Sequence, residues 1–377
     1  MNDVYVFLGP SLPVDQARQI LDATYLPPVS CGDVTELLLD RPAPTMIGIV
    51  DGLFEQVPSV WHKEILFAID RGTRVFGASS MGALRAAELH DFGMIGVGEV
   101  FEAFRESRYE DDDEVALVHA SAEDGYQPLS EAMVNLRAGL TAALDTGAIS
   151  RTAHDALLAD AKQTFYAERS WARLYASASG LGVSEDEVKA LSRLVAEQRP
   201  DVKRDDALAM LRAMRDDTDA SPRPTASSFD FEPTYYWEKL VRFVRHARVE
   251  REVRERWGVS AAELFSAARS QAPESIWAAL TEVLVRQEVE RLGLLSPSDM
   301  APPGVSDAHG RSLGEVGEDE SLQTLVDITA HHLRSELLGP LTKECARQGS
   351  AADLFAIPRA PAGDESDDIP RPRDRGE

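Results

Sequence analysis

The sequence predicts an α/β protein, with an N-terminal parallel-sheet domain followed by a C-terminal all-α domain. In the first third, short apolar segments alternate with segments of helical spacing, as in βαβ units. From about residue 127 onward the strand signals fade, and amphipathic helical segments follow one another. We therefore expect an α/β domain at 1–125, a helical domain at 126–345, and a disordered, Pro-rich charged tail at 346–377.

Three strands are expected in the first domain, at residues 4–9, 46–52 and 73–78. Helices are expected after them, at residues 14–21, 58–72 and 82–89. The second of these helices has Pro58 at a plausible first position and Gly72 at its end, which is the usual order of start and stop signals.

In the second domain the expected helical segments are 129–147, 149–168, 184–198, 204–217, 233–258 and 274–293. They are separated by Gly, Pro or acidic breaks. Residues 219–228 have the composition of an exposed linker.

Composition excludes several classes of function. The net charge of −25 argues against nucleic-acid binding, which needs a basic surface, and favours basic partners instead. The two cysteines lie far apart, so we expect neither a disulfide framework nor a zinc site. No apolar run is long enough to cross a membrane, and the N-terminus lacks a signal-peptide pattern, so a cytoplasmic protein is expected.

No metal or cofactor is expected. The acidic run at residues 110–114 (EDDDE) lacks the spaced ligands and the glycine of an EF-hand loop. We expect a solvated turn there, or an acidic patch for a basic partner. The turn GPSLP after the first strand could bind phosphate, but it lacks the P-loop pattern.

Polar side chains follow the three expected strands. Ser11 follows the first, Asp51 the second, and Ser79 with Ser80 the third. Ligands of open α/β sheets bind beyond the carboxyl ends of the strands. Ser80 could attack a carbonyl there, while the N–H groups of Met81 and Gly82 hold the oxyanion. The alternative is that Ser80 is only a helix N-cap.

A serine nucleophile needs a base. Lys63 lies near the start of helix 58–72, at the same sheet edge, and its long side chain could reach Ser80. As a base it would have to be largely neutral, through burial and the helix dipole. The alternatives are that Lys63 is a solvated helix residue and that Asp51 only forms a turn.

Four stretches between residues 7 and 119 resemble the TfuA family: FLGPSL, DGLFEQVPSVWHKEIL, FGASSMGALRAAELHDFGMIGVGEVFEAF and EDDDEVALVH. Members of that family accompany YcaO enzymes, which activate peptide amides with ATP. The resemblance implies a role in peptide backbone thioamidation, in which a thiocarboxylated ThiS-like sulfur-carrier protein is hydrolysed and sulfide is released for the YcaO partner. The peptide substrate would then be engaged only indirectly.

By motif, the Ser–Lys pair proposed for the family falls on Ser80 and Lys63, with Ser79 as a rival nucleophile. Supporting roles are expected for Asp51, which could orient Lys63 or His62, and for Ser11, which could line the cleft. Arg85 could grip a carboxylate of the carrier, or it could simply pair with Glu88 three residues on.

Two functions thus remain open from the sequence. The first is a hydrolase that releases sulfide through Ser80 and Lys63. The second is a non-catalytic adaptor, which recruits the peptide and the sulfur carrier to YcaO through the large helical half.

Overall fold

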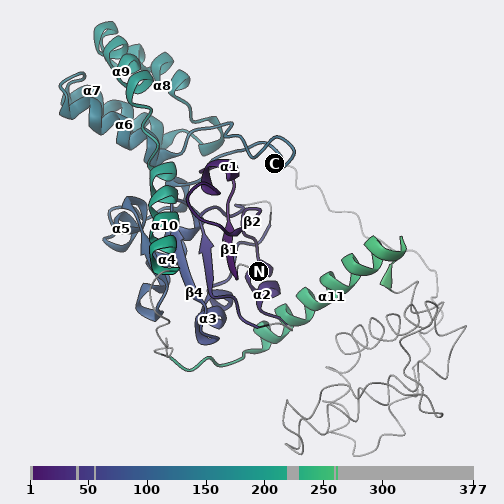
Figure 1. Cartoon of the computed structure of the whole chain (residues 1–377). Helices are drawn as coiled ribbons and strands as arrows, with labels where there is room; N and C mark the ends of the chain where they lie inside the picture. Colours follow the sequence, from purple (N-terminus) through teal and green to yellow (C-terminus); the bar gives the residue numbers. More distant parts are fainter. Residues whose placement is uncertain (1–2, 40–41, 55–56, 219–228, 259, 262–377) are drawn as a thin grey trace, which may run out of the picture. The chain divides into compact units, whose positions relative to one another are not determined.

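The computed structural model describes residues 3–39, 42–54, 57–218, 229–258 and 260–261 (Figure 1). The chain divides into two units, Met1–Arg245 and His246–Glu377. The expected linker at 219–228, the expected helix at 274–293 and the expected tail at 346–377 lie outside the described residues.

A five-stranded parallel sheet confirms the predicted α/β class. Its order is β2-β1-β3-β4-β5, with Phe7 of β1 opposite Ile49 of β3 and Ile49 opposite Gly77 of β4. The strands are β1 Val4–Phe7, β2 Thr24–Leu26, β3 Met46–Ile49, β4 Arg74–Ala78 and β5 Ile95–Val97. The two edge strands were not predicted, because each has three residues and a partly exposed, weakly apolar pattern.

The helices of the α/β part are α1 Val14–Ala17, α2 Asp33–Leu38, α3 His62–Asp70, α4 Met81–Leu89 and α5 Glu99–Arg105. Helix α3 begins four residues later than Pro58 suggests. Trp61 has an extended backbone at the N-cap, and its N–H donates to the Glu64 carboxylate at 3.0 Å. The same buried carboxylate accepts from the N–H groups of Gly32 and Thr35, and it thereby joins the starts of α2 and α3.

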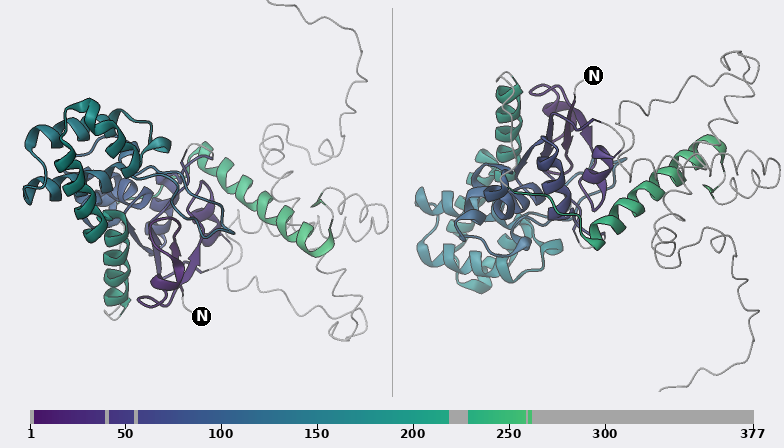
Figure 2. Two further views of the ribbon diagram at one scale, coloured as in Figure 1. Left: turned by 90° about the horizontal axis from the view of Figure 1, so that it is seen from above. Right: turned by 90° about the horizontal axis from the view of Figure 1, so that it is seen from below.

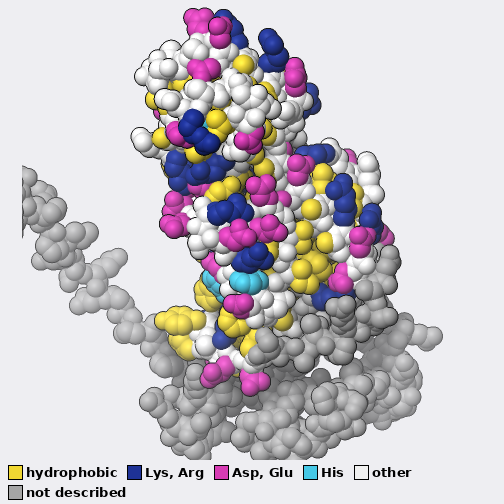
Figure 3. Space-filling view, turned by 90° about the vertical axis from the view of Figure 1, so that its left-hand side faces the viewer, with side chains coloured by type: hydrophobic (Ala, Val, Ile, Leu, Met, Phe, Trp, Pro, Cys, Tyr) yellow, Lys and Arg dark blue, Asp and Glu magenta, His cyan; other side chains and the backbone are white. Residues whose placement is uncertain are grey.

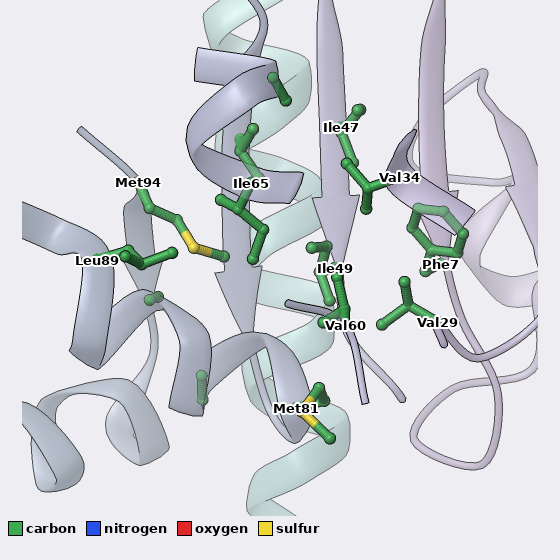
Figure 4. Close-up of a cluster of buried hydrophobic side chains, with 14 of the residues drawn as sticks. Phe7, Val29, Val34, Ile47, Ile49, Val60, Ile65, Met81, Leu89 and Met94 are labelled. Atoms are coloured by element: carbon green, nitrogen blue, oxygen red, sulfur yellow. The ribbon is translucent and has the colours of Figure 1, made fainter. Parts of the chain in front are cut away.

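Both faces of the sheet are covered, as expected for a doubly wound fold. One face packs Ile47, Ile49 and Val75 against buried residues of α2, α3, α4 and α5 (Figure 4). On the other face, Met46 and Phe76 pack against α1 and against a helix from much later in the chain. Alternate residues of one strand thus point into two separate cores.

That later helix is α10, Val202–Thr218, whose Ala207, Met210, Leu211 and Met214 are buried on the sheet (Figure 1). A Cβ at Gly48 of β3 would lie 2.7 Å from the Met214 sulfur, so this glycine allows the close approach. The boundary predicted at residue 125 therefore does not separate two bodies. A helix of the predicted second domain forms one layer of the first.

Four helices that precede α10 in the sequence share a hydrophobic core of their own. They are α6 Met133–Asp145, α7 Arg151–Gln163, α8 Trp171–Ser177 and α9 Glu185–Gln198. Both views of Figure 2 show them as a group beside the sheet. Residues 235–257 form the last described helix, α11 Tyr235–Trp257. None of the helices in the described ranges is long and apolar enough to cross a membrane.

Candidate active site

The start of α4 lies directly on the backbones of two strands. A Cβ at Gly82 would come within 1.7 Å of the Ile49 carbonyl oxygen, and one at Gly77 within 2.1 Å of the Gly82 carbonyl oxygen. Only glycine permits this packing, since each of the two closest atoms belongs to the backbone. It fixes Ser79 and Ser80 at the carboxyl edge of the sheet, between β4 and α4.

The two serines have different environments. Ser79 is buried and has φ +68°, an uncommon conformation for a residue other than glycine. Ser80 is 2% exposed and stands at the N-cap position of α4, but its side chain makes no capping hydrogen bond. Ser80 is therefore the N-cap residue by position only, and its hydroxyl contacts another group.

The partner of Ser80 is a lysine that was not among the predicted site residues. Lys203 Nζ lies 3.1 Å from Ser80 Oγ and 2.8 Å from the Val115 carbonyl oxygen. Lys203 is 2% exposed and belongs to the first turn of α10. Ser80 and Lys203 lie 123 residues apart in the sequence, and the packing of α10 on the sheet brings them together.

Burial lowers the pKa of Lys203, because the charged ammonium loses its water. The carboxylates of Asp51, Asp201 and Glu131 act in the opposite direction. The balance is a lysine with a pKa below its ordinary value, in contact with a serine hydroxyl. Such a lysine is neutral more often than a solvated one, and a neutral amine can accept a proton.

Polar contacts hold the first turn of α10 in place. Asn135 of α6 donates to Asp201 at 3.1 Å and to Glu131 at 2.9 Å, and its side-chain oxygen accepts from the Lys203 N–H at 3.4 Å. Asp201 also accepts from the Arg204 N–H at 3.1 Å. Helix α6 thus positions the backbone from which Lys203 extends.

The acidic run at 110–114 is exposed at residues 110–112, as its composition predicts, but Asp113 and Glu114 form ion pairs and are less exposed. Glu114 is 2% exposed and accepts two hydrogen bonds from Arg137, at 2.7 and 2.8 Å. Asp113 pairs with Lys162 and with the buried Arg169. This network joins the run to α6 and α7 and fixes the neighbouring Val115, whose carbonyl holds Lys203.

A second polar cluster lies beside the pair. The buried Asp51 carboxylate accepts from the Gly9 N–H at 2.9 Å, the Ser11 N–H at 3.1 Å and the Ser11 hydroxyl at 2.6 Å. Ser79 Oγ donates to Ser11 Oγ at 2.9 Å. Ser11, Asp51 and Ser79 are therefore together, as expected from the strand ends. Two of the three N–H donors of the GPSLP turn, those of Gly9 and Ser11, already bind Asp51, which leaves them unavailable for a phosphate.

Lys63 does not reach Ser80. Its Nζ lies 5.0 Å from the centre of the Phe231 ring, and it makes no described contact with the turn. The reason is the later start of α3, which places Lys63 on the second residue of the helix, against an aromatic cluster formed with Phe67 and Trp237. The expected pairing of Ser80 with Lys63 is therefore wrong, because the lysine that contacts Ser80 is Lys203.

Arg85 and Glu88 line a neighbouring hollow, and His62 contacts Glu88. Arg85 pairs with Glu88 at 2.6 Å, and His62 Nε2 lies 2.8 Å from the same carboxylate. Arg85 also donates to the Val60 carbonyl oxygen at 3.0 Å. Of the two expected partners of Arg85, the structure thus shows Glu88. Asp51, which was expected to orient Lys63 or His62, contacts neither of them in the described structure.

One of the two expected oxyanion donors is already used. The Gly82 N–H donates to the Val50 carbonyl oxygen at 3.3 Å, which leaves it with a partner in the resting protein. For the Met81 N–H, no acceptor is found among the described residues. Met81 therefore remains the candidate donor.

A cavity of about 210 Å³ opens onto the pair. Ser80, Lys203 and Asp51 lie in its wall. The loop after β3, including Leu53 and Phe54, also lines it, as do Val115 and residues 117–121. Among the described residues no group of His, Cys, Asp and Glu is arranged to hold a metal ion.

On the face drawn in Figure 3, basic and acidic side chains are interspersed.

Lys203 did leave a signal in the sequence. It falls on the same helical stripe as Ala207, Met210 and Met214, at positions that a sheet-covering helix buries. A single lysine on an apolar stripe is costly unless it has a function or a partner. The signal is visible only once α10 is known to cover the sheet.

Fold and site together define a doubly wound α/β protein with a buried serine–lysine pair at the carboxyl edge of its sheet. The family model described as TfuA-like protein matches residues 51–170. Residues 51–170 thus match the TfuA-like family, which confirms the resemblance seen in the motifs. The segment includes Ser80 and ends before Lys203. No curated protein matches the chain.

Proposed function

We propose that this protein is a hydrolase that releases sulfide from a thiocarboxylated ThiS-like carrier protein, as the partner of a YcaO enzyme in peptide backbone thioamidation. The observation that carries the proposal is the contact of 3.1 Å between Ser80 Oγ and the buried Lys203 Nζ. The match of residues 51–170 to the TfuA-like family supports the reaction and the partners that the sequence resemblance implies. The contact supplies a nucleophile and a base for that reaction.

In the first step Ser80 Oγ attacks the thiocarboxylate carbon, and its proton passes to neutral Lys203. The developing oxyanion accepts from the Met81 N–H, at the positive end of α4. The C–S bond then breaks, and sulfur leaves with the proton from Lys203 as hydrosulfide. The carrier is left as an acyl ester on Ser80, and Lys203 is neutral again.

In the second step water attacks the ester carbon and gives a proton to Lys203. The bond between the carbonyl carbon and Ser80 Oγ breaks, and Lys203 returns the proton to the serine. The carrier leaves as a carboxylate, and the second proton of the water passes to solvent. Ser79 does not act here, because its hydroxyl donates to Ser11 and is part of the cluster around Asp51.

The test is sulfide release from a purified thiocarboxylated carrier, with wild-type protein and with Ser80→Ala, in the absence of YcaO. Wild type is expected to release sulfide, and the variant to lose at least about 100-fold in rate. Ser79→Ala serves as the matched control on the neighbouring serine, and it is expected to retain most of the activity.

Equal rates for wild type and Ser80→Ala would contradict the mechanism. If folded wild type released no sulfide, with or without YcaO, the adaptor would be the better account. An adaptor would still bind the carrier and the YcaO enzyme, which a pull-down with Ser80→Ala would detect.

A further inference from the structure

Residues 117–130 form a small antiparallel hairpin beside the cavity. The Ala120 N–H donates to the Gln127 carbonyl oxygen at 2.9 Å, and the Leu129 N–H donates to the Val118 carbonyl oxygen at 2.7 Å. His119 lies opposite Pro128 as the bridged pair between them. In such a pair neither residue bonds to the other, so the His119 N–H and C=O point away from the partner strand.

The outer edge of this hairpin has free backbone groups. Leu117 lies two residues before His119, so its backbone N–H and carbonyl point to the same edge. For both residues these groups have no hydrogen-bond partner among the described residues. An unpaired strand edge of this kind can accept another extended chain. Pro128, which has no N–H, occupies a position where the hairpin needs none.

That free edge lies along the cavity of Ser80 and Lys203. Five consecutive residues, 117–121, line the cavity. Side chains of a strand alternate between two faces, so five in a row can line one cavity only if the backbone edge runs along it. Just before this segment, Val115 holds Lys203 through its carbonyl. The edge therefore leads toward the reacting pair.

We propose that the outer edge of residues 117–121 binds the C-terminal tail of the protein substrate as an added antiparallel strand. Its occupant, the tail of the sulfur carrier, rests on the proposed function. The negatively charged chain end is placed at Lys203 and Ser80, near Val115, and the tail runs from there toward Ser121. Four to five tail residues span this length, at about 3.3 Å each. Recognition is then by backbone and is tolerant of the tail's side chains.

The test uses full-length wild-type protein and a synthetic peptide of the last ten residues of the carrier, with an ordinary carboxylate end. Each of the last five residues is N-methylated in turn, and the dissociation constant is measured by fluorescence anisotropy. Methylation at alternate residues is expected to weaken binding about tenfold, because only alternate N–H groups face the edge. Methylation at the residues between them is expected to have a smaller effect.

The matched change in the protein is His119→Pro. It removes the outward N–H without removing a hairpin hydrogen bond, as Pro128 does on the opposite strand. His119→Ala removes the imidazole and keeps the N–H. We expect His119→Pro to weaken peptide binding about tenfold more than His119→Ala does. An unchanged thermal unfolding midpoint will show that the hairpin is intact.

An equal effect at all five methylated positions would overturn the proposal, and so would equal binding by the two His119 variants or no binding at millimolar peptide. The binding assay requires no sulfide release. Alternating binding without sulfide release would contradict the proposed hydrolysis alone. Sulfide release without alternation would contradict the added strand alone.

Discussion

Lys203 is surrounded by opposing influences on its pKa. Burial favours the neutral amine, and three carboxylates favour the ammonium. A base must be neutral to accept the Ser80 proton, so sulfide release should rise as the pH rises through the Lys203 pKa. Because burial prevails, this rise is expected at a lower pH than the ordinary lysine value of 10.5.

Asp201→Asn tests this balance. The substitution removes one of the charges that raise the Lys203 pKa and keeps the side-chain oxygen that accepts from Asn135 and Arg204. The profile of kcat/KM against pH should move to lower pH. Asp206→Asn, within α10, is the control, since Asp206 is not among the groups that act on Lys203. A profile that moves to higher pH, or not at all, would contradict the assignment.

The approach of α4 to the sheet depends on Gly82. In Gly82→Ala the new methyl group would overlap the Ile49 carbonyl oxygen, and backbone cannot give way as a flexible side chain can. We expect a loss of about 3 kcal/mol in unfolding free energy, or a Tm lower by roughly 5–10 °C. In Gly180→Ala the added Cβ meets nothing within 4 Å, so this control should leave Tm nearly unchanged.

Helix α10 is also joined to α5, through Asp206. The carboxylate of Asp206 accepts from the N–H groups of Glu99 and Val100 at 2.9 Å each. Burial nevertheless raises the pKa of Asp206 from 3.8 to about 6. A carboxyl that holds its proton more tightly in the folded state favours folding at low pH, and this contribution is lost as the pH rises from about 4 to about 6.

Asp206→Asn should therefore abolish one component of the pH dependence of stability. At 1.36 kcal/mol per pKa unit, the component amounts to about 3 kcal/mol. The unfolding free energies of wild type and variant are measured by urea titration at pH 4 and pH 7. Relative to the variant, wild type should lose about this amount of unfolding free energy as the pH rises from 4 to 7. A difference that stays constant with pH would show that Asp206 has an ordinary pKa.

At the scale of the whole molecule, the site is assembled from distant parts of the chain. The turn with Ser80 comes from the α/β part. Lys203 comes from a helix that returns to the sheet after four helices with a core of their own. The acidic run with Asp113 and Glu114 connects these helices to the α/β part. The base is therefore in place only when the chain folds as one unit up to residue 218.

The same long-range packing explains what could be predicted from the sequence. The α/β class, the three central strands and the turn with Ser80 follow from local periodicity and turn chemistry. The cluster of Ser11, Asp51 and Ser79 follows from the rule that parallel strands end at one edge. The choice between Lys63 and Lys203 depended on where α3 begins and on which helix covers the second face of the sheet. Neither of these two features can be predicted from a local sequence pattern.

Sulfide release by Lys203→Ala and by Lys63→Ala, measured on the same thiocarboxylated carrier, tests the central claim most directly. Lys203→Ala should lose at least about 100-fold, since it removes the base that contacts Ser80. Lys63→Ala should remain within about threefold of wild type, because it removes only a contact with the half-buried Phe231 ring, away from Ser80. Loss of activity in Lys63→Ala together with full activity in Lys203→Ala would contradict the account.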